Sequence, residues 1–148
     1  MSVHEPRRAD IGSRLRAGLV ALGSLAVLGI AAGLEASDEG IGTHTQLGMP
    51  PCMFREATGY PCMTCGMTTS FSHAADMDLV SSASVQPVGL LLAVLTAAAF
   101  WASLSVAIGG STLGRQVAGT LTGRALWIGA ALIAAGWVYK LLTAAPAW

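Results

Sequence analysis

The sequence predicts an all-α membrane protein with three transmembrane helices and a short cysteine-bearing helical segment between the first and second. Three observations support this prediction. Hydrophobic residues make up 53% of the 148 residues and charged residues only 11%, against about 25% charged in soluble domains. Three long stretches are almost free of charge, and every cysteine lies between the first two of them. The net charge is zero, so no basic surface predicts a nucleic-acid partner.

The first predicted spanning helix covers residues 17–34 and follows a basic tail, residues 1–16. The run carries no charge, and at about 1.5 Å per residue it nearly crosses a hydrocarbon core of about 30 Å. A basic start before an apolar run is also typical of a signal peptide, with residues 31–33 as a cleavage site. Because the run is longer than a signal core of about 7–15 residues, we expect a retained helix.

The second and third predicted spanning helices cover residues 87–109 and 125–145. Pro87 suits a first helical turn, where no N–H donor is needed. Lys140 is the one charge inside the third run, and we expect its ammonium to reach the lipid headgroups. The three helices and the cysteine segment form one membrane domain, residues 17–145, with the lipid bilayer as partner.

The orientation follows from the lysines and arginines. Four arginines lie in the N-terminal tail and two in the connection between the second and third helices, whereas Arg55 is the one such residue between 35 and 86. The positive-inside rule therefore places the N-terminus in the cytoplasm and the cysteine segment outside.

The cysteine-rich segment, residues 50–78, contains Cys52, Cys62 and Cys65. The last two form a C-x-x-C motif, a spacing at which two sulfurs reach one metal ion or each other. A glycine and a proline before Cys62 favour a turn that brings Cys52 close. Residues 67–75 lack helix breakers and predict a helix after the motif, whose positive end lowers the pKa of a nearby thiol.

Metal binding is one function that the residues of this segment predict. Three thiolates and an imidazole suit zinc, so the candidate ligands are Cys52, Cys62, Cys65 and His73. His73 lies about two helical turns, roughly 12 Å, beyond the motif, and His44 precedes it on a loop. Five of the six methionines lie in or just before the segment, and thioether with thiolate sulfur suits Cu(I) better than zinc. Packing against apolar helices is the other interpretation of these methionines.

Two further roles of the cysteines stay open, namely a structural disulfide and thiol–disulfide exchange. The leading hypothesis is a non-enzymatic membrane component in which the three cysteines organise an extracytoplasmic surface layer, with or without a zinc or copper ion at its centre. The first alternative is a membrane thiol–disulfide oxidoreductase in which Cys62 attacks, Cys65 resolves and Cys52 acts as a shuttle. The second is an assembly partner that binds other membrane helices through its small-residue faces.

Several features of the segment form one combined pattern: Cys52, the run TGYPCMTCGMT at residues 58–68, Asp78, and Gln86 with Pro87 before an apolar helix. This pattern resembles the bacterial family called domain of unknown function 2752 over roughly residues 50–100. The family commonly has proline, arginine, glycine and asparagine where this chain has Met63, Thr69, Met77 and Gln86.

The resemblance implies a small bacterial integral membrane protein, located in the inner membrane. The resemblance does not indicate which reaction, if any, the protein catalyses. Because Thr69 replaces the common arginine, any activity that depends on that arginine is not carried over to this chain.

Overall fold

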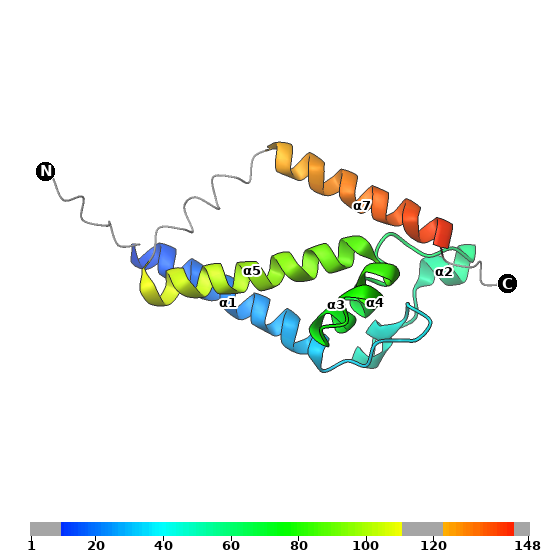
Figure 1. Ribbon diagram of the computed structural model, residues 1–148, viewed down its shortest axis with the longest axis horizontal. Coiled ribbons are helices and arrows are strands. Elements are labelled where there is room, and N and C mark those ends of the chain that lie inside the picture. Colours follow the sequence, from blue (N-terminus) through cyan, green and yellow to red (C-terminus); the bar gives the residue numbers. More distant parts are fainter. Residues whose placement is uncertain (1–9, 111–122, 144–148) are drawn as a thin grey trace, which may run out of the picture.

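The computed structural model describes residues 10–110 and 123–143, and every regular element in these ranges is helical. The elements are α1 (Ile11–Ala32), the 3-10 helix η1 (Thr43–Leu47), α2 (Met53–Thr58), α3 (Met67–Ala75), α4 (Leu79–Val85), α5 (Pro87–Gly109) and α7 (Gly123–Thr143). The all-α prediction is therefore confirmed. The four short elements gather at the end where α1 stops and α5 begins (Figure 1). These elements and their loops, residues 33–86, are called the cysteine layer below.

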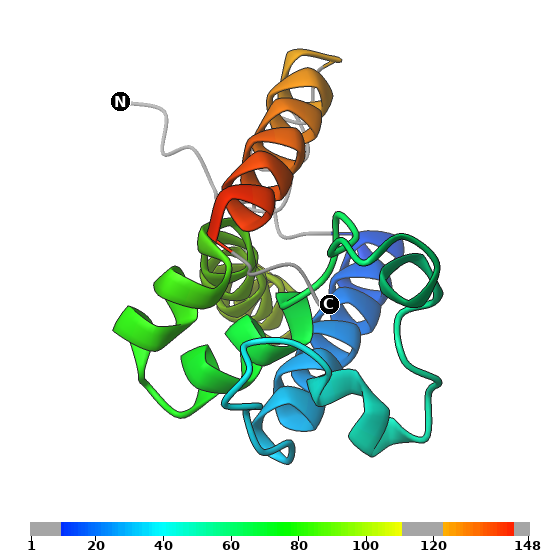
Figure 2. The ribbon, with the colours of Figure 1, turned by 90° about the vertical axis from the view of Figure 1, so that its right-hand side faces the viewer.

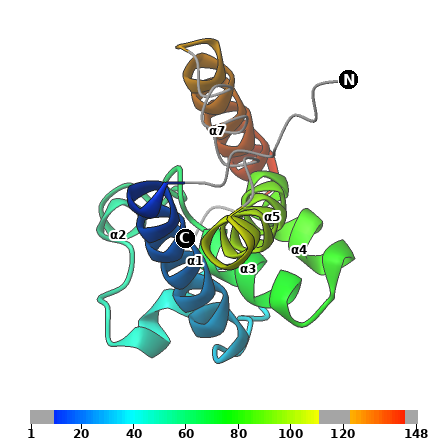
Figure 3. The same ribbon diagram turned by 90° about the vertical axis from the view of Figure 1, so that its left-hand side faces the viewer.

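The long helices α1 and α5 lie side by side and run in opposite directions (Figures 1 and 3). Their buried residues are mostly small, such as Ala21 on α1 and Ala93 and Ser103 on α5. Small side chains let two helices approach closely where no hydrophobic effect drives them together. Both helices are long and apolar enough to cross a membrane, with lengths of about 33 and 35 Å at about 1.5 Å per residue.

The first helix begins at Ile11, six residues before the predicted start at residue 17. Asp10 caps it by accepting a hydrogen bond from the Gly12 N–H. Arg14 then donates to the carbonyls of Ala107 and Ile108 at the end of α5, at 3.0 and 3.1 Å. The end of the predicted basic tail is therefore helical, and its Arg14 caps the C-terminus of the neighbouring helix. Residues 1–9 lie outside the described ranges.

The second predicted spanning helix has the bounds of α5, Pro87–Gly109, with Pro87 in its first turn. The third corresponds to α7, which begins two residues earlier than predicted, and residues 144–145 lie outside the described ranges. Of the described helices, α1 and α5 are the candidate spans. A third crossing by α7 stays a prediction.

Helix α7 diverges from the other two (Figures 1 and 3) and reaches the cysteine layer with its last turns (Figure 2). It meets α5 at Gly136, where a Cβ atom would lie 2.6 Å from Val88 Cγ2. Elsewhere its apolar side chains are exposed, with Trp127 80% and Leu142 82% accessible. The tertiary contacts of α7 are therefore concentrated in its second half.

Hydroxyl groups form the core of the cysteine layer. Thr43 and Thr69 bond to each other at 2.8 Å, and Ser70 Oγ lies 2.9 Å from Ser82 Oγ and donates to the Gln86 carbonyl at 3.0 Å. Buried hydroxyls need such partners. Among the described residues, the largest fully buried side chains all belong to this layer: Thr43, Thr69, Ser70, Ser72, Ser82 and Gln86.

Candidate metal centre

The three cysteines come from two separate parts of the layer. Cys52 stands at the N-terminus of α2, whereas Cys62 and Cys65 flank a tight turn in which the Cys65 N–H donates to the Cys62 carbonyl. Gly66 follows in the left-handed conformation, with φ at 84°, and opens α3. The three sulfur atoms lie within 4.8 Å of one another, and those of Cys62 and Cys65 are 3.2 Å apart. All three are free thiols.

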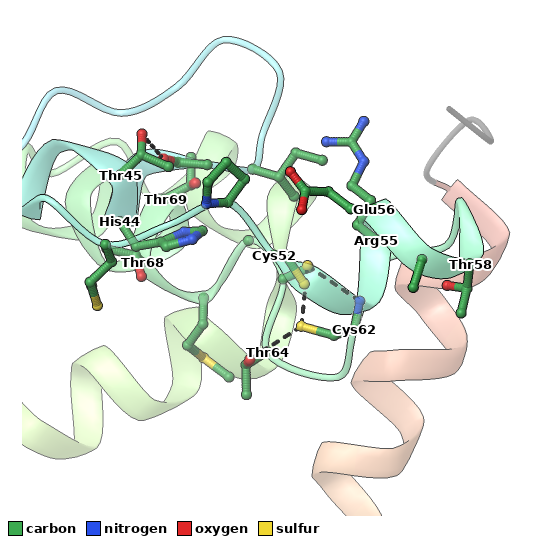
Figure 4. Close-up of a pocket in the computed structure, with 18 of the residues that line it drawn as sticks. His44, Thr45, Cys52, Arg55, Glu56, Thr58, Cys62, Thr64, Thr68 and Thr69 are labelled. Atoms are coloured by element: carbon green, nitrogen blue, oxygen red, sulfur yellow. Dashed lines mark hydrogen bonds between the residues drawn. The ribbon is translucent and has the colours of Figure 1, made fainter. Parts of the chain in front are cut away.

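The cluster opens into a cavity of about 910 Å³. In Figure 4, His44 and Thr68 lie on one side of it, Arg55 and Glu56 lie on the other, and Cys52 and Cys62 lie between them. The walls come from the loop around η1, from α2 and from the start of α3. The thiols are therefore accessible to a small ligand that enters from this side.

The surroundings of the two thiols of the motif shift their pKa values in opposite directions. Partial burial opposes ionisation of Cys62, but hydrogen bonds from the Thr64 hydroxyl and the other two thiols outweigh it and lower the pKa of Cys62 to about 7. Burial, together with the hydrogen bond to Cys62, raises the pKa of Cys65 to about 12. Cys62 is therefore the thiol that ionises first.

His73, predicted as a fourth ligand, does not join the three cysteines. It lies in the last turn of α3, and its Nδ1 is 3.7 Å from an Asp78 carboxylate oxygen. Asp78 caps α4, and hydrogen bonds from Ser81 hold the pKa of its carboxyl group below the ordinary value. His44, by contrast, lines the cavity beside the cysteines, with its Nε2 3.2 Å from the Pro50 carbonyl.

The methionines divide into two groups. Met49 and Met67 line the same cavity as the cysteines. Met53 and Met77 are 76% and 79% accessible and point away from the core. Two thioethers therefore accompany the thiols, and Met53 and Met77 form part of the outer surface of the layer.

Two residues of α7 contact the cysteine motif, and these contacts were not predicted from the sequence. Trp137 Nε1 donates to the Pro61 carbonyl at 3.1 Å. Lys140 is only 6% accessible, so its ammonium is buried in the layer, which corrects the expectation that it reaches the headgroups. A lysine inside an apolar run is itself a signal of function in membrane proteins, but the sequence cannot identify its partners.

Fold and site define a class: a small all-helical protein that carries two potential membrane spans and a three-thiol cluster at one end of them. Residues 52–101 match the family model described as "Protein of unknown function (DUF2752)". The matched segment contains all three cysteines and the first part of α5. Neither a curated protein nor a solved structure matches the chain.

Proposed function

We propose that the protein is a small multi-pass membrane protein that binds one thiophilic metal ion, zinc or Cu(I), through Cys52, Cys62 and Cys65. The supporting observation is that three free thiols lie within 4.8 Å of one another. Sulfurs held at about 2.3 Å from a tetrahedral zinc ion are about 3.8 Å apart. One disulfide would use two of the three sulfurs, whereas a metal ion uses all of them.

The fourth coordination position is best supplied by His44. Three cysteines and one histidine form a common structural zinc site, and His44 is the histidine that lines the cavity with the cysteines. If the ion is Cu(I), Met49 and Met67 offer soft thioether ligands from the same walls. His73 is the weaker candidate because its ring lies beside Asp78.

A bacterial inner-membrane location with the cysteine layer outside is part of this proposal. The lengths of α1 and α5 and their exposed apolar side chains support a lipid environment. The distribution of arginines and lysines favours a cytoplasmic N-terminus. We include α7 as a third span, since it has 21 residues, and its exposed face suits lipid or another membrane helix.

The test is metal analysis of the full-length protein in detergent, reduced and then loaded with zinc or with Cu(I). We expect about one bound ion per chain, lost in Cys52→Ser and Cys65→Ser and reduced in His44→Ala. His73→Ala is the matched control and keeps the ion. A wild-type protein without bound metal, or a Cys52→Ser variant that binds as well as the wild type, contradicts the proposal.

Thiol–disulfide exchange is a second candidate because of the contrast between Cys62 and Cys65. A partly exposed thiol with a pKa of about 7 beside a buried one with a raised pKa resembles an attacking and a resolving pair. The Cys62 thiolate would attack a substrate disulfide, form a mixed disulfide and release one substrate thiolate. Cys65 would then attack Cys62, which forms the Cys62–Cys65 disulfide and releases the second thiolate. A reduction potential of this pair below about −300 mV would mark an inert bond.

A further inference from the structure

The last turns of α7 contact the C-x-x-C turn at both of its ends. Trp137 Nε1 donates to the carbonyl of Pro61, the residue before Cys62. Lys140 Nζ lies 3.0 Å from the position that a Cβ atom on Gly66 would occupy, directly after Cys65. In Figure 1 this end of α7 meets the layer, whereas its start lies apart from α5. A helix distant in sequence therefore flanks the turn that carries two of the three sulfurs.

The ammonium of Lys140 has incomplete charge compensation. It donates to the carbonyls of Gly40 at 3.3 Å and Val85 at 3.1 Å, and an ammonium has three hydrogens to donate. Within residues 10–110 and 123–143, no carboxylate forms an ion pair with it; the ion pair found there joins His73 and Asp78. Burial of a charge is costly unless an opposite charge is close.

The cysteine cluster is a potential source of the opposite charge. Lys140 Nζ lies beside Gly66, the residue directly after Cys65, and it interacts electrostatically with Cys65 as well as with the like-charged Arg55. When three thiols bind a metal they release three protons, so a divalent ion with three thiolates carries a net charge of −1 and a monovalent ion carries −2. A neutral fourth ligand such as His44 leaves that charge unchanged. The loaded centre is thus an anion beside a buried cation.

We propose that Lys140 is a positioning residue that balances the charge of the metal–thiolate centre and thereby couples metal binding to the docking of α7. This inference rests on the proposed metal-binding function. Because coupling between two events is reciprocal, a bound metal ion strengthens the attachment of α7, and the Lys140 charge strengthens metal binding. The third helix is then part of the metal site although it supplies no ligand.

The test compares the zinc affinity of four full-length proteins in detergent by competition with a chromophoric chelator. We expect Lys140→Gln to bind zinc about tenfold more weakly, equivalent to about 1.4 kcal/mol. Lys140→Arg, which keeps the charge, should recover most of the affinity. Tyr139→Phe is the matched control, because it removes the 2.8 Å hydrogen bond from α7 to the Ser84 carbonyl without changing a charge, and it should bind like the wild type.

Thermal unfolding separates a charge effect from a purely structural one. If Lys140 balances the charge of the metal–thiolate centre, the metal-free Lys140→Gln protein melts no lower than the metal-free wild type. Zinc should then raise the melting temperature of Lys140→Gln by less than it raises that of the wild type. Equal zinc affinity of Lys140→Gln and wild type overturns the inference. An equal loss in Lys140→Gln and Lys140→Arg also overturns it, because charge would then not matter. A wild type that binds no zinc refutes the metal-binding function itself, and the two failures are therefore distinguishable.

Discussion

The α1–α5 pair and the cysteine layer are held together by different forces. In the helix pair, small residues meet along a narrow seam, and large apolar side chains such as Leu19 and Trp101 are 70% and 67% exposed. In the layer, the most buried side chains are hydroxyls and an amide, and the hydroxyls bond to each other or to backbone carbonyls. The long helices therefore need hydrophobicity and length, whereas the layer needs particular residues at particular positions. Substitutions should therefore affect the two regions very differently.

The largest effect is expected at Gly89, where the layer packs on α5. A Cβ atom there would lie 2.7 Å from both Cβ and Oγ of Ser70, so Gly89→Ala should separate α3 from α5 and cost about 1–3 kcal/mol. Thermal unfolding in detergent measures this change. Gly109→Ala, on the same helix with nothing within 4 Å of the added atom, should leave the melting temperature nearly unchanged; equal losses in both variants would contradict the close packing.

The second-largest effect concerns the reactivity of the thiols in the cysteine layer, since the α1–α5 pair contains no thiol. Because the pKa of Cys62 is lowered to about 7, its thiolate is present above that pH and disappears as the pH falls below it. Alkylation of the reduced, metal-free protein should therefore accelerate about tenfold per unit between pH 5 and 6 and level off above about pH 8. Cys65, with a pKa near 12, should react at least about 100-fold more slowly at pH 7. Peptide mapping by mass spectrometry distinguishes the sites, and equal rates would be inconsistent with this asymmetry.

A paired substitution tests which kind of residue each region depends on. Thr43→Val removes a hydroxyl that bonds Thr69 and accepts from the Ser37 N–H, and we expect a loss of about 1–3 kcal/mol because buried partners are left unpaired. Leu19→Ala removes a larger apolar group from an exposed face of α1 and should cost much less in detergent. If Leu19→Ala lowers the melting temperature more than Thr43→Val does, the layer does not depend on its buried hydroxyls more than the helices depend on their exposed apolar side chains.

The smallest effect is a gain in stability at Met77. This residue has φ at 63°, a left-handed conformation that strains a side chain with a Cβ atom, and glycine is common at this position in the family resembled. Met77→Gly should stabilise the protein by about 0.5 kcal/mol, as the relieved strain slightly exceeds the added entropy of the unfolded chain. Met53 lies at the exposed start of α2 with ordinary helical geometry, so Met53→Gly should not stabilise the protein. If Met53→Gly also raises the melting temperature, relief of backbone strain does not explain the effect at Met77.

Much of the fold could be predicted because its signals are local. The start of α5 follows from Pro87, and the helix at residues 67–75 follows from the absence of helix breakers. The convergence of the cysteines was also expected from the turn residues before Cys62. The start of α1 was misjudged because charged side chains were taken to end the helix, whereas Arg14 reaches the end of α5.

Apolar helices of membrane length and a thiol-bearing segment between two of them can be read from the amino acids alone, because hydrophobic runs and residue spacing act over a few neighbouring positions. Three features instead depend on tertiary packing: His44 rather than His73 lies at the cavity, Thr43 meets Thr69, and Lys140 lies beside the cysteine turn. Those contacts depend on where helices cross and how closely glycines let them approach. Lys140 and Gly40, which are 100 residues apart, meet only once α7 has packed against α5.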